Sequence, residues 1–256
     1  MTTPKHHWRE YLIEVAALGT FMMSAATMTV MLEHPESPLH GVVAEPMTRR
    51  VLMGIAMGLT AAAIIYSPWG RRSGAHMNPA VTLTFLRLGK IDGRDALAYV
   101  GAQFVGGVLG IGLAAFALAG WIADPAVNYV ATAPGVFGHA AAFAGEALIS
   151  FVMMLVVLTA SNQRRVAPFT GVIVAMLIAT FIALEAPLSG MSMNPARSLG
   201  PDVVGDTWRG LWIYFVAPPL GMLAAAETFL RVRGRLAVRC AKLHHDRGPC
   251  IFNCGY

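Results

Sequence analysis

Long apolar runs separated by short polar stretches make up most of the chain. Each run is close to the roughly 20 residues that an α-helix needs to cross the hydrocarbon core of a bilayer. Glycine and proline occur inside several runs, which membrane helices tolerate better than soluble ones do. The pattern predicts transmembrane helices over residues 11–32, 51–67, 96–122, 140–160, 166–184 and 211–230.

The composition favours a membrane protein over a soluble domain. Of the 256 residues, 56% are hydrophobic and 13% are charged, whereas a soluble domain carries about 25% charged residues. So little polar chain could not cover six apolar helices in water. The first run lacks a small-residue cleavage pattern after it, so we interpret it as a transmembrane helix and not as a signal peptide.

The positive charges predict the orientation. Of the 19 lysines and arginines, all except Arg49, Arg50, Arg197 and Arg209 fall on the side that holds both termini. The positive-inside rule therefore predicts a multi-pass protein of the plasma or inner membrane with cytoplasmic termini. The basic residues are scattered over loops and the tail, so they do not indicate a nucleic-acid partner.

The pattern SGxxMNPA occurs twice, from Ser73 to Ala80 and from Ser189 to Ala196. Each copy follows the second of three predicted spans, so the chain divides into two halves. Halves with an odd number of spans insert with opposite orientation, which predicts an inverted repeat. The apolar stretch after each motif is too short to cross the membrane and is a candidate re-entrant segment.

The three residues Asn-Pro-Ala favour the start of a helix, because Asn is a preferred N-cap, Pro suits the first helical position and Ala is the best helix former. Two half-helices entering from opposite faces would meet near the bilayer centre. Irregular backbone at that depth is tolerated only inside protein or beside a wet cavity, so the repeat predicts a pore. The predicted pore motifs are Asn78, Pro79, Ala80, Asn194, Pro195 and Ala196.

With Arg197 directly after the second motif, the sequence resembles the aquaporin, or major intrinsic protein, family from about Trp8 to Leu230. The resemblance implies an all-α membrane fold of six transmembrane helices and two re-entrant half-helices, assembled as a homotetramer. The expected layout is a cytoplasmic segment (1–8), a first repeat (9–122), an outer connecting loop (123–138), a second repeat (139–230) and a cytoplasmic tail (231–256).

The resemblance also places a selectivity filter at Met57, Ile182, Met191 and Arg197, with Gly58 as the alternative to Met57. This set lacks the histidine and the aromatic residue of the familiar water-selective pattern. Methionine side chains repack readily, so we expect water and other small neutral solutes to pass. The Asn78 and Asn194 amides are expected to donate hydrogen bonds into the lumen, where they help to exclude protons.

Three further polar residues have expected roles. Glu146 matches the family's membrane-buried glutamate and should accept hydrogen bonds from loop N–H groups, with Glu14 as a weaker match in the first half. His76 is expected to line the inner vestibule. If the carboxylates instead carried a coupling proton, the protein would be a secondary transporter.

The tail after the last span holds all three cysteines, Cys240, Cys250 and Cys254, together with His244 and His245. Their spacing matches no standard zinc pattern. Disulfides are not expected in a reducing compartment. We therefore expect a disordered tail without a metal site.

These observations predict a passive channel for water and other small uncharged solutes that excludes protons and ions. The alternatives are a glycerol or small-solute facilitator with weak water selectivity, an ion-coupled secondary transporter and a non-conducting membrane scaffold. An enzyme is not indicated, because the spans show no nucleophile–base pair, phosphate-binding loop or metal-ligand spacing. No cofactor is expected, and the expected partners are the solutes and membrane lipids.

Overall fold

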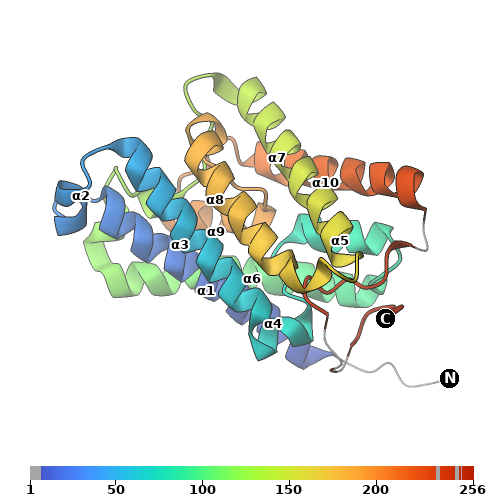
Figure 1. Ribbon diagram of the computed structural model, residues 1–256. Coiled ribbons are helices and arrows are strands. Elements are labelled where there is room, and N and C mark those ends of the chain that lie inside the picture. Colours follow the sequence, from blue (N-terminus) through green and yellow to red (C-terminus); the bar gives the residue numbers. More distant parts are fainter. Residues whose placement is uncertain (1–6, 235–236, 246–247, 249) are drawn as a thin grey trace.

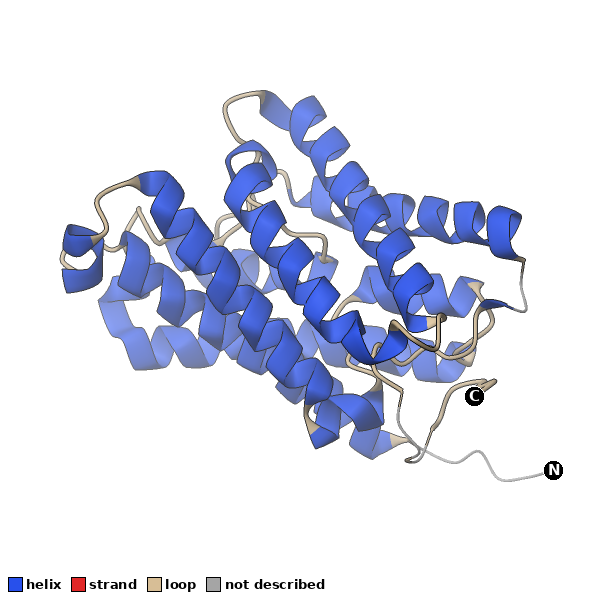
Figure 2. Ribbon diagram, viewed as in Figure 1, coloured by secondary structure: helices blue, strands red, loops and turns tan. Residues whose placement is uncertain are grey.

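The computed structural model describes residues 7–234, 237–245, 248 and 250–256, so most of the predicted N-terminal segment and a few tail residues lie outside the description. All regular structure in the described ranges is helical (Figures 1 and 2). Six of these helices are long and apolar enough to cross a membrane, as predicted. They are α1 (Trp8–Glu33), α3 (Pro46–Tyr66), α6 (Gly93–Leu118), α7 (Gly138–Ser161), α8 (Thr170–Ser189) and α10 (Leu211–Arg233).

The start of α3 differs from the sequence-based expectation, because the helix begins at Pro46 and not at Val51. The Glu45 side chain caps it by accepting hydrogen bonds from the Met47 and Thr48 N–H groups. These bonds, led by the one from Met47, lower the pKa of Glu45 below its ordinary value. Proline at the first helical position adds a second start signal, so capping extends the helix through polar residues.

Shorter helices connect the spans. Two were not predicted, α2 (Pro38–Val42) and α4 (Pro68–Ser73), and each begins with a proline at its first position. Single 3₁₀ turns lie at Ala119–Ala123, Asn128–Val130 and Ala167–Phe169. They bring the chain across the ends of the long helices.

The two repeated motifs form the predicted half-helices, α5 (Pro79–Arg87) and α9 (Pro195–Gly205). Asn78 Oδ1 accepts a hydrogen bond from Ala80 N at 2.8 Å, and Asn194 Oδ1 accepts one from Ala196 N at 3.0 Å. Each motif therefore starts its helix by the capping chemistry that its residues suggest. With 9 and 11 residues, neither helix is long enough to cross a bilayer.

The packing of the helices follows the inverted repeat. Within the first half α1 packs along α6, and within the second half α7 packs along α10 in the same way. The second helices of the two halves, α3 and α8, pack against each other. Each half-helix then packs on the third long helix of the opposite half, α5 on α10 and α9 on α6. The two halves are thereby interlocked around the motif segments.

Close helix contacts depend on glycine. A Cβ atom added at Gly106 of α6 would lie 2.5 Å from the carbonyl oxygen of Val15 in α1. A Cβ atom added at Gly58 of α3 would lie equally close, 2.5 Å, to the carbonyl oxygen of Ala175 in α8. Small residues at membrane helix crossings allow this approach of backbones. The Gly-x-x-x-Gly spacing of Gly106 and Gly110 therefore serves packing.

Gly106→Ala is expected to destabilise the protein by about 1–3 kcal/mol, because α1 must move away from α6 to admit the methyl group. Gly101→Ala is the matched control on the same helix, since its Cβ would meet nothing within 4 Å. Thermal unfolding in detergent, followed by intrinsic fluorescence, should show a lower midpoint for the first variant only. Equal midpoints would contradict the close-contact assignment.

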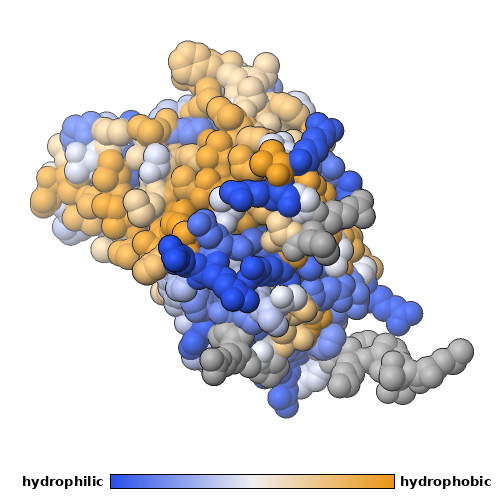
Figure 3. Space-filling view, turned by 45° about the vertical axis from the view of Figure 1, so that its right-hand side comes forward, coloured by the Kyte–Doolittle hydropathy of each residue, from blue (hydrophilic) through white to orange (hydrophobic). Residues whose placement is uncertain are grey.

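The surface has the character of a membrane protein. Apolar residues cover the upper and left parts of the face in Figure 3, and hydrophilic residues gather from its centre toward the lower right. Large apolar side chains on the spanning helices are exposed, among them Phe116 (89%), Leu97 (75%) and Leu59 (64%). A soluble monomer rarely exposes apolar patches of this extent, so this surface is suited to contact with lipid.

Candidate functional site: a cavity between the two halves

A cavity of about 490 Å³ lies between the two halves and brings together the predicted filter and motif residues. Its wall includes Met57, Ile182, Met191, Arg197, Asn78, Asn194 and His76. The alternative filter residue Gly58 packs against the backbone of α8 instead. The prolines and alanines of the motifs are buried and do not line the cavity; they form the first turns of α5 and α9.

The two motif asparagines tie the half-helices together. Asn78 Nδ2 donates to the carbonyl oxygen of Met193, and Asn194 Nδ2 donates to that of Met77, both at 2.7 Å. Each side-chain amide has two N–H donors, so one N–H of each asparagine remains for the cavity that both residues line. Donation of these remaining N–H groups to a solute stays a prediction.

Two buried glutamates hold the loops before the half-helices in equivalent ways. Glu146 of α7 accepts from Ser192 N and Met193 N, each at 2.7 Å, and from the Ser189 hydroxyl at 2.7 Å. These are the contacts expected for this glutamate, since the loop N–H groups have no helical partner.

Glu14 of α1 repeats this arrangement in the first half, although its sequence match was the weaker one. It accepts from His76 N at 3.1 Å, from Met77 N at 2.6 Å and from the Ser73 hydroxyl at 2.7 Å. Gln103 of α6 adds a fourth donor at 2.9 Å. Both side chains are fully buried, so each carboxylate is satisfied by the loop that it supports.

The loops themselves have unusual backbone conformations. Positive φ angles occur at Gly74, Ala75 and Met77 in the first loop and at Gly190, Met191 and Met193 in the second. For residues other than glycine, each such angle costs about 1–2 kcal/mol. The glutamate hydrogen bonds offset this cost. Both loops line the cavity, the first through Ala75, His76 and Met77 and the second through the residues from Gly190 to Met193.

Arg197 lies at the start of α9 and lines the cavity. Its Nη1 donates to the Val130 carbonyl oxygen at 3.0 Å, and its backbone N–H donates to Asn194 Oδ1 at 3.3 Å. Val130 belongs to the loop between α6 and α7. The contact fixes one end of the guanidinium group to this loop.

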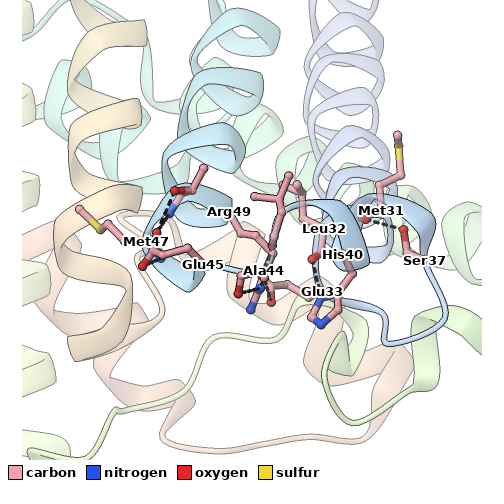
Figure 4. A network of polar contacts seen from close by, with 11 residues as sticks. Met31, Leu32, Glu33, Ser37, His40, Ala44, Glu45, Met47 and Arg49 are labelled. Carbon is pink, nitrogen blue, oxygen red and sulfur yellow. Dashed lines mark hydrogen bonds and ion pairs between the residues drawn. The ribbon is translucent and has the colours of Figure 1, made fainter.

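Glu33 at the end of α1 and Arg50 near the start of α3 line one end of the cavity, and Figure 4 shows the polar contacts of the segment that joins these two helices. Arg49 is buried there: its Nε donates to Glu33 Oε2 at 3.0 Å and its Nη1 to the Ala44 carbonyl oxygen at 2.9 Å. Charged side chains of both signs therefore line this end of the cavity.

His76 lies at the opposite end of the cavity with both ring nitrogens in contact with polar atoms. Its Nε2 donates to the Ala241 carbonyl oxygen at 2.9 Å, and its Nδ1 lies 3.0 Å from Thr82 Oγ1. The ring is stacked between Phe85 and Phe252, with centroid distances of 5.2 and 5.4 Å. The ring lines the cavity as part of a packed cluster, and its assignment to an inner vestibule stays a prediction.

The expectation of a disordered tail is wrong for the described residues after α10. Cys240, Ala241, Leu243 and Phe252 are all less than 10% exposed, and the Leu243 N–H donates to the Gly74 carbonyl oxygen at 3.1 Å. Figure 1 shows this dark red segment at the lower right, where α3 ends and α8 begins. Apolar burial against the motif loop holds it there, which the polar composition of the tail concealed.

Sequence reasoning also missed several residues that support the loops. The Tyr99 hydroxyl donates to the Ser73 carbonyl oxygen at 2.7 Å, and the Tyr214 hydroxyl donates to that of Ser189 at 2.5 Å. The two tyrosine–serine pairs occupy equivalent places in the two halves. A residue-by-residue comparison of the halves could therefore have found them. Among the described residues, no side-chain amide donates to Glu146 as Gln103 donates to Glu14, so Gln103 would have been harder to find.

Comparison with known proteins gives consistent matches. The sequence model of the family described as "Major intrinsic protein" matches residues 1–229. The "Probable aquaporin NIP-type" of Nicotiana alata is 37% identical over 180 residues, which cover 70% of this chain and 64% of that protein. The "Probable aquaporin AqpM" of Archaeoglobus fulgidus is 39% identical over 183 residues, which cover 68% and 73%. The chain thus spans less than two thirds of the Nicotiana relative's length.

A solved structure has the same fold. The X-ray structure of the aquaglyceroporin from Plasmodium falciparum superposes with a TM-score of 0.75 and covers 91% of this chain and 99% of its own. The sequences are 20% identical. At this identity the likeness concerns the arrangement of helices and half-helices.

Proposed function

Because the chain belongs to the major intrinsic protein family, we propose that it is a passive transmembrane channel for water and other small uncharged solutes. The observation that carries this proposal is the pair of half-helices that meet start to start beside a continuous cavity. The Asn78 and Asn194 amides join them, and both residues line that cavity. The relatives described above are named as probable aquaporins and an aquaglyceroporin, which supports the same class of function.

The electrostatics of the cavity favour neutral solutes. Each half-helix start carries roughly half a positive elementary charge, and Arg197 adds a full charge on the same wall. A water molecule that accepts from both asparagines points its hydrogens away from them in both directions, which interrupts a proton wire. The carboxylates Glu14 and Glu146 are occupied by loop donors, so they are poorly placed to carry a coupling proton.

Proteoliposome swelling with a light-scattering readout tests the proposal. Water flux should have a low activation energy and should not depend on a proton gradient. Uptake that requires the gradient would support an ion-coupled transporter, and the absence of flux for water, glycerol and urea would support a non-conducting scaffold. Either result would overturn the proposed channel function.

We assign the filter to Met57, Ile182, Met191 and Arg197, which combine apolar contacts with one set of N–H donors. Such a lining suits solutes with an apolar and a polar side, so glycerol and urea should pass besides water. A glycerol facilitator with weak water selectivity is the alternative within this class, and the ratio of the two fluxes decides between them.

Ile182→His should lower glycerol and urea flux by more than about tenfold and leave water flux within about twofold. The imidazole ring narrows the passage and replaces an apolar contact by a polar one, which alters the discrimination by about 1–3 kcal/mol. Ile182→Val is the matched control, because it keeps the lining apolar. An unchanged glycerol-to-water ratio in the histidine variant would remove Ile182 from the filter.

The same proposal includes the protein's setting. The uneven distribution of positive charge supports cytoplasmic termini in a plasma or inner membrane, and the exposed apolar helix faces support a homotetramer in contact with lipid. Labelling of Cys254 by a membrane-impermeant thiol reagent, with a metal chelator present to keep the thiol free of metal, tests the topology, since it should occur only in inside-out vesicles. Mass measurement of the detergent-solubilised complex tests the oligomeric state.

A further inference from the structure

We propose that Cys240, His245, Cys250 and Cys254 form a zinc site that clamps the C-terminal tail over the inner end of the cavity. One ligand atom from each of these residues lies within 4.8 Å of all the others. Three thiolates and one imidazole are a standard ligand set of structural zinc sites. The sequence concealed the site because its spacing, with four, four and three intervening residues, departs from the usual short Cys-x-x-Cys pairs.

The distances suit a tetrahedral ion. With zinc–sulfur bonds of about 2.3 Å, neighbouring sulfur atoms of a tetrahedron lie ~3.8 Å apart. The Sγ atoms of Cys240 and Cys250 are 3.6 Å apart, and His245 Nε2 lies 3.1 Å from Cys254 Sγ. Small shifts of side chains would therefore place all four ligand atoms around one ion. Soft thiolate ligands favour zinc over magnesium or calcium.

Surrounding residues hold the histidine in place. The Tyr256 ring stacks on His245 at a centroid distance of 4.3 Å, and its hydroxyl donates to the Ser161 carbonyl oxygen at 2.5 Å. The Arg239 guanidinium lies 5.4 Å from the same ring. Three thiolates around a divalent ion leave one net negative charge, which this cation and the buried Lys242 beside the site help to balance.

The ligands lie on the two tail segments that contact the pore loop. Next to Cys240, the Ala241 carbonyl accepts from His76, and Leu243 lines the cavity. Between Cys250 and Cys254, Phe252 stacks on His76. An ion shared by both segments would fix an apolar side chain at the inner end of the cavity, and apolar constrictions can close a pore by excluding water. This consequence rests on the proposed channel function, whereas the metal site does not.

Metal binding is tested on the full chain purified without a polyhistidine tag. One zinc ion per chain is expected, and Co²⁺ should give the intense visible absorption of a tetrahedral thiolate site. His245→Ala should weaken zinc binding by at least about tenfold, as should Cys250→Ser, whereas the adjacent His244→Ala should not. Zinc absent from the wild type even after incubation with Zn²⁺, equal binding by all variants, or a Cys240–Cys250 disulfide in the purified protein would overturn the site.

Permeation is tested separately by proteoliposome swelling with internal Zn²⁺ or a zinc chelator. Chelation should raise wild-type water flux severalfold, and His245→Ala should be fast and insensitive to zinc. If the protein conducts water and binds one zinc ion, but its water flux is the same with Zn²⁺ as with the chelator, the clamp is overturned and the zinc site is retained. If neither the wild type nor His245→Ala conducts water with the chelator present, the channel function fails, while the metal measurement still decides the site.

Discussion

Glu146→Ala is expected to prevent the protein from folding stably. The substitution leaves Ser192 N, Met193 N and the Ser189 hydroxyl without their acceptor. A buried donor that loses its partner costs about 1–3 kcal/mol, so the three together approach the total stability of about 5–15 kcal/mol that is typical of a folded protein. The loop also has positive φ angles that these bonds help to maintain.

The measurement is the yield and the thermal midpoint of the detergent-solubilised protein, followed by size-exclusion chromatography. Glu146→Gln should be intermediate, because an amide keeps one acceptor oxygen but presents an N–H group to a second donor. Glu227→Ala is the matched control, since this glutamate forms an exposed ion pair with Arg87 and such pairs contribute about 0–1 kcal/mol. A stable, monodisperse Glu146→Ala protein would refute the supporting role.

Arg197→Val is expected to have the second largest effect, a cation and proton leak with water flux retained. A unit charge about 6 Å from a passing cation contributes roughly 3 kcal/mol of repulsion at an effective dielectric constant of about 20. Loss of this repulsion corresponds to a rise of about a hundredfold in cation permeability. The half-helix starts remain, so part of the exclusion should persist.

Proton leak is measured in proteoliposomes that hold an internal pH-sensitive dye and are placed in a potassium gradient. Cation leak is measured as the flux of a monovalent tracer cation. Arg197→Lys is the control that retains the charge but loses the fixed contact to the Val130 carbonyl. It should leak far less than the valine variant. Equal leak in both variants would show that charge is not the cause, and no leak in either would remove Arg197 from ion exclusion.

The sequence alone determined the parts of this protein that depend on local chemistry and on the solvent. Apolar length predicted the six spans, because a bilayer demands about 20 apolar residues for each crossing. The repeated motif predicted two helix starts, because capping by Asn78 and Asn194 needs only the residues that follow each asparagine. The odd number of spans in each half then required opposite orientations.

Only the tertiary structure decided which distant groups meet. The contact of Glu14 with the first loop crosses 62 residues, and that of His76 with the Ala241 carbonyl crosses 165, so no local pattern reveals either. The same holds for the four metal-ligand candidates, whose irregular spacing concealed a compact cluster. Helix starts and membrane spans are encoded by neighbours along the chain, whereas a site built from several segments exists only after apolar burial has brought those segments together.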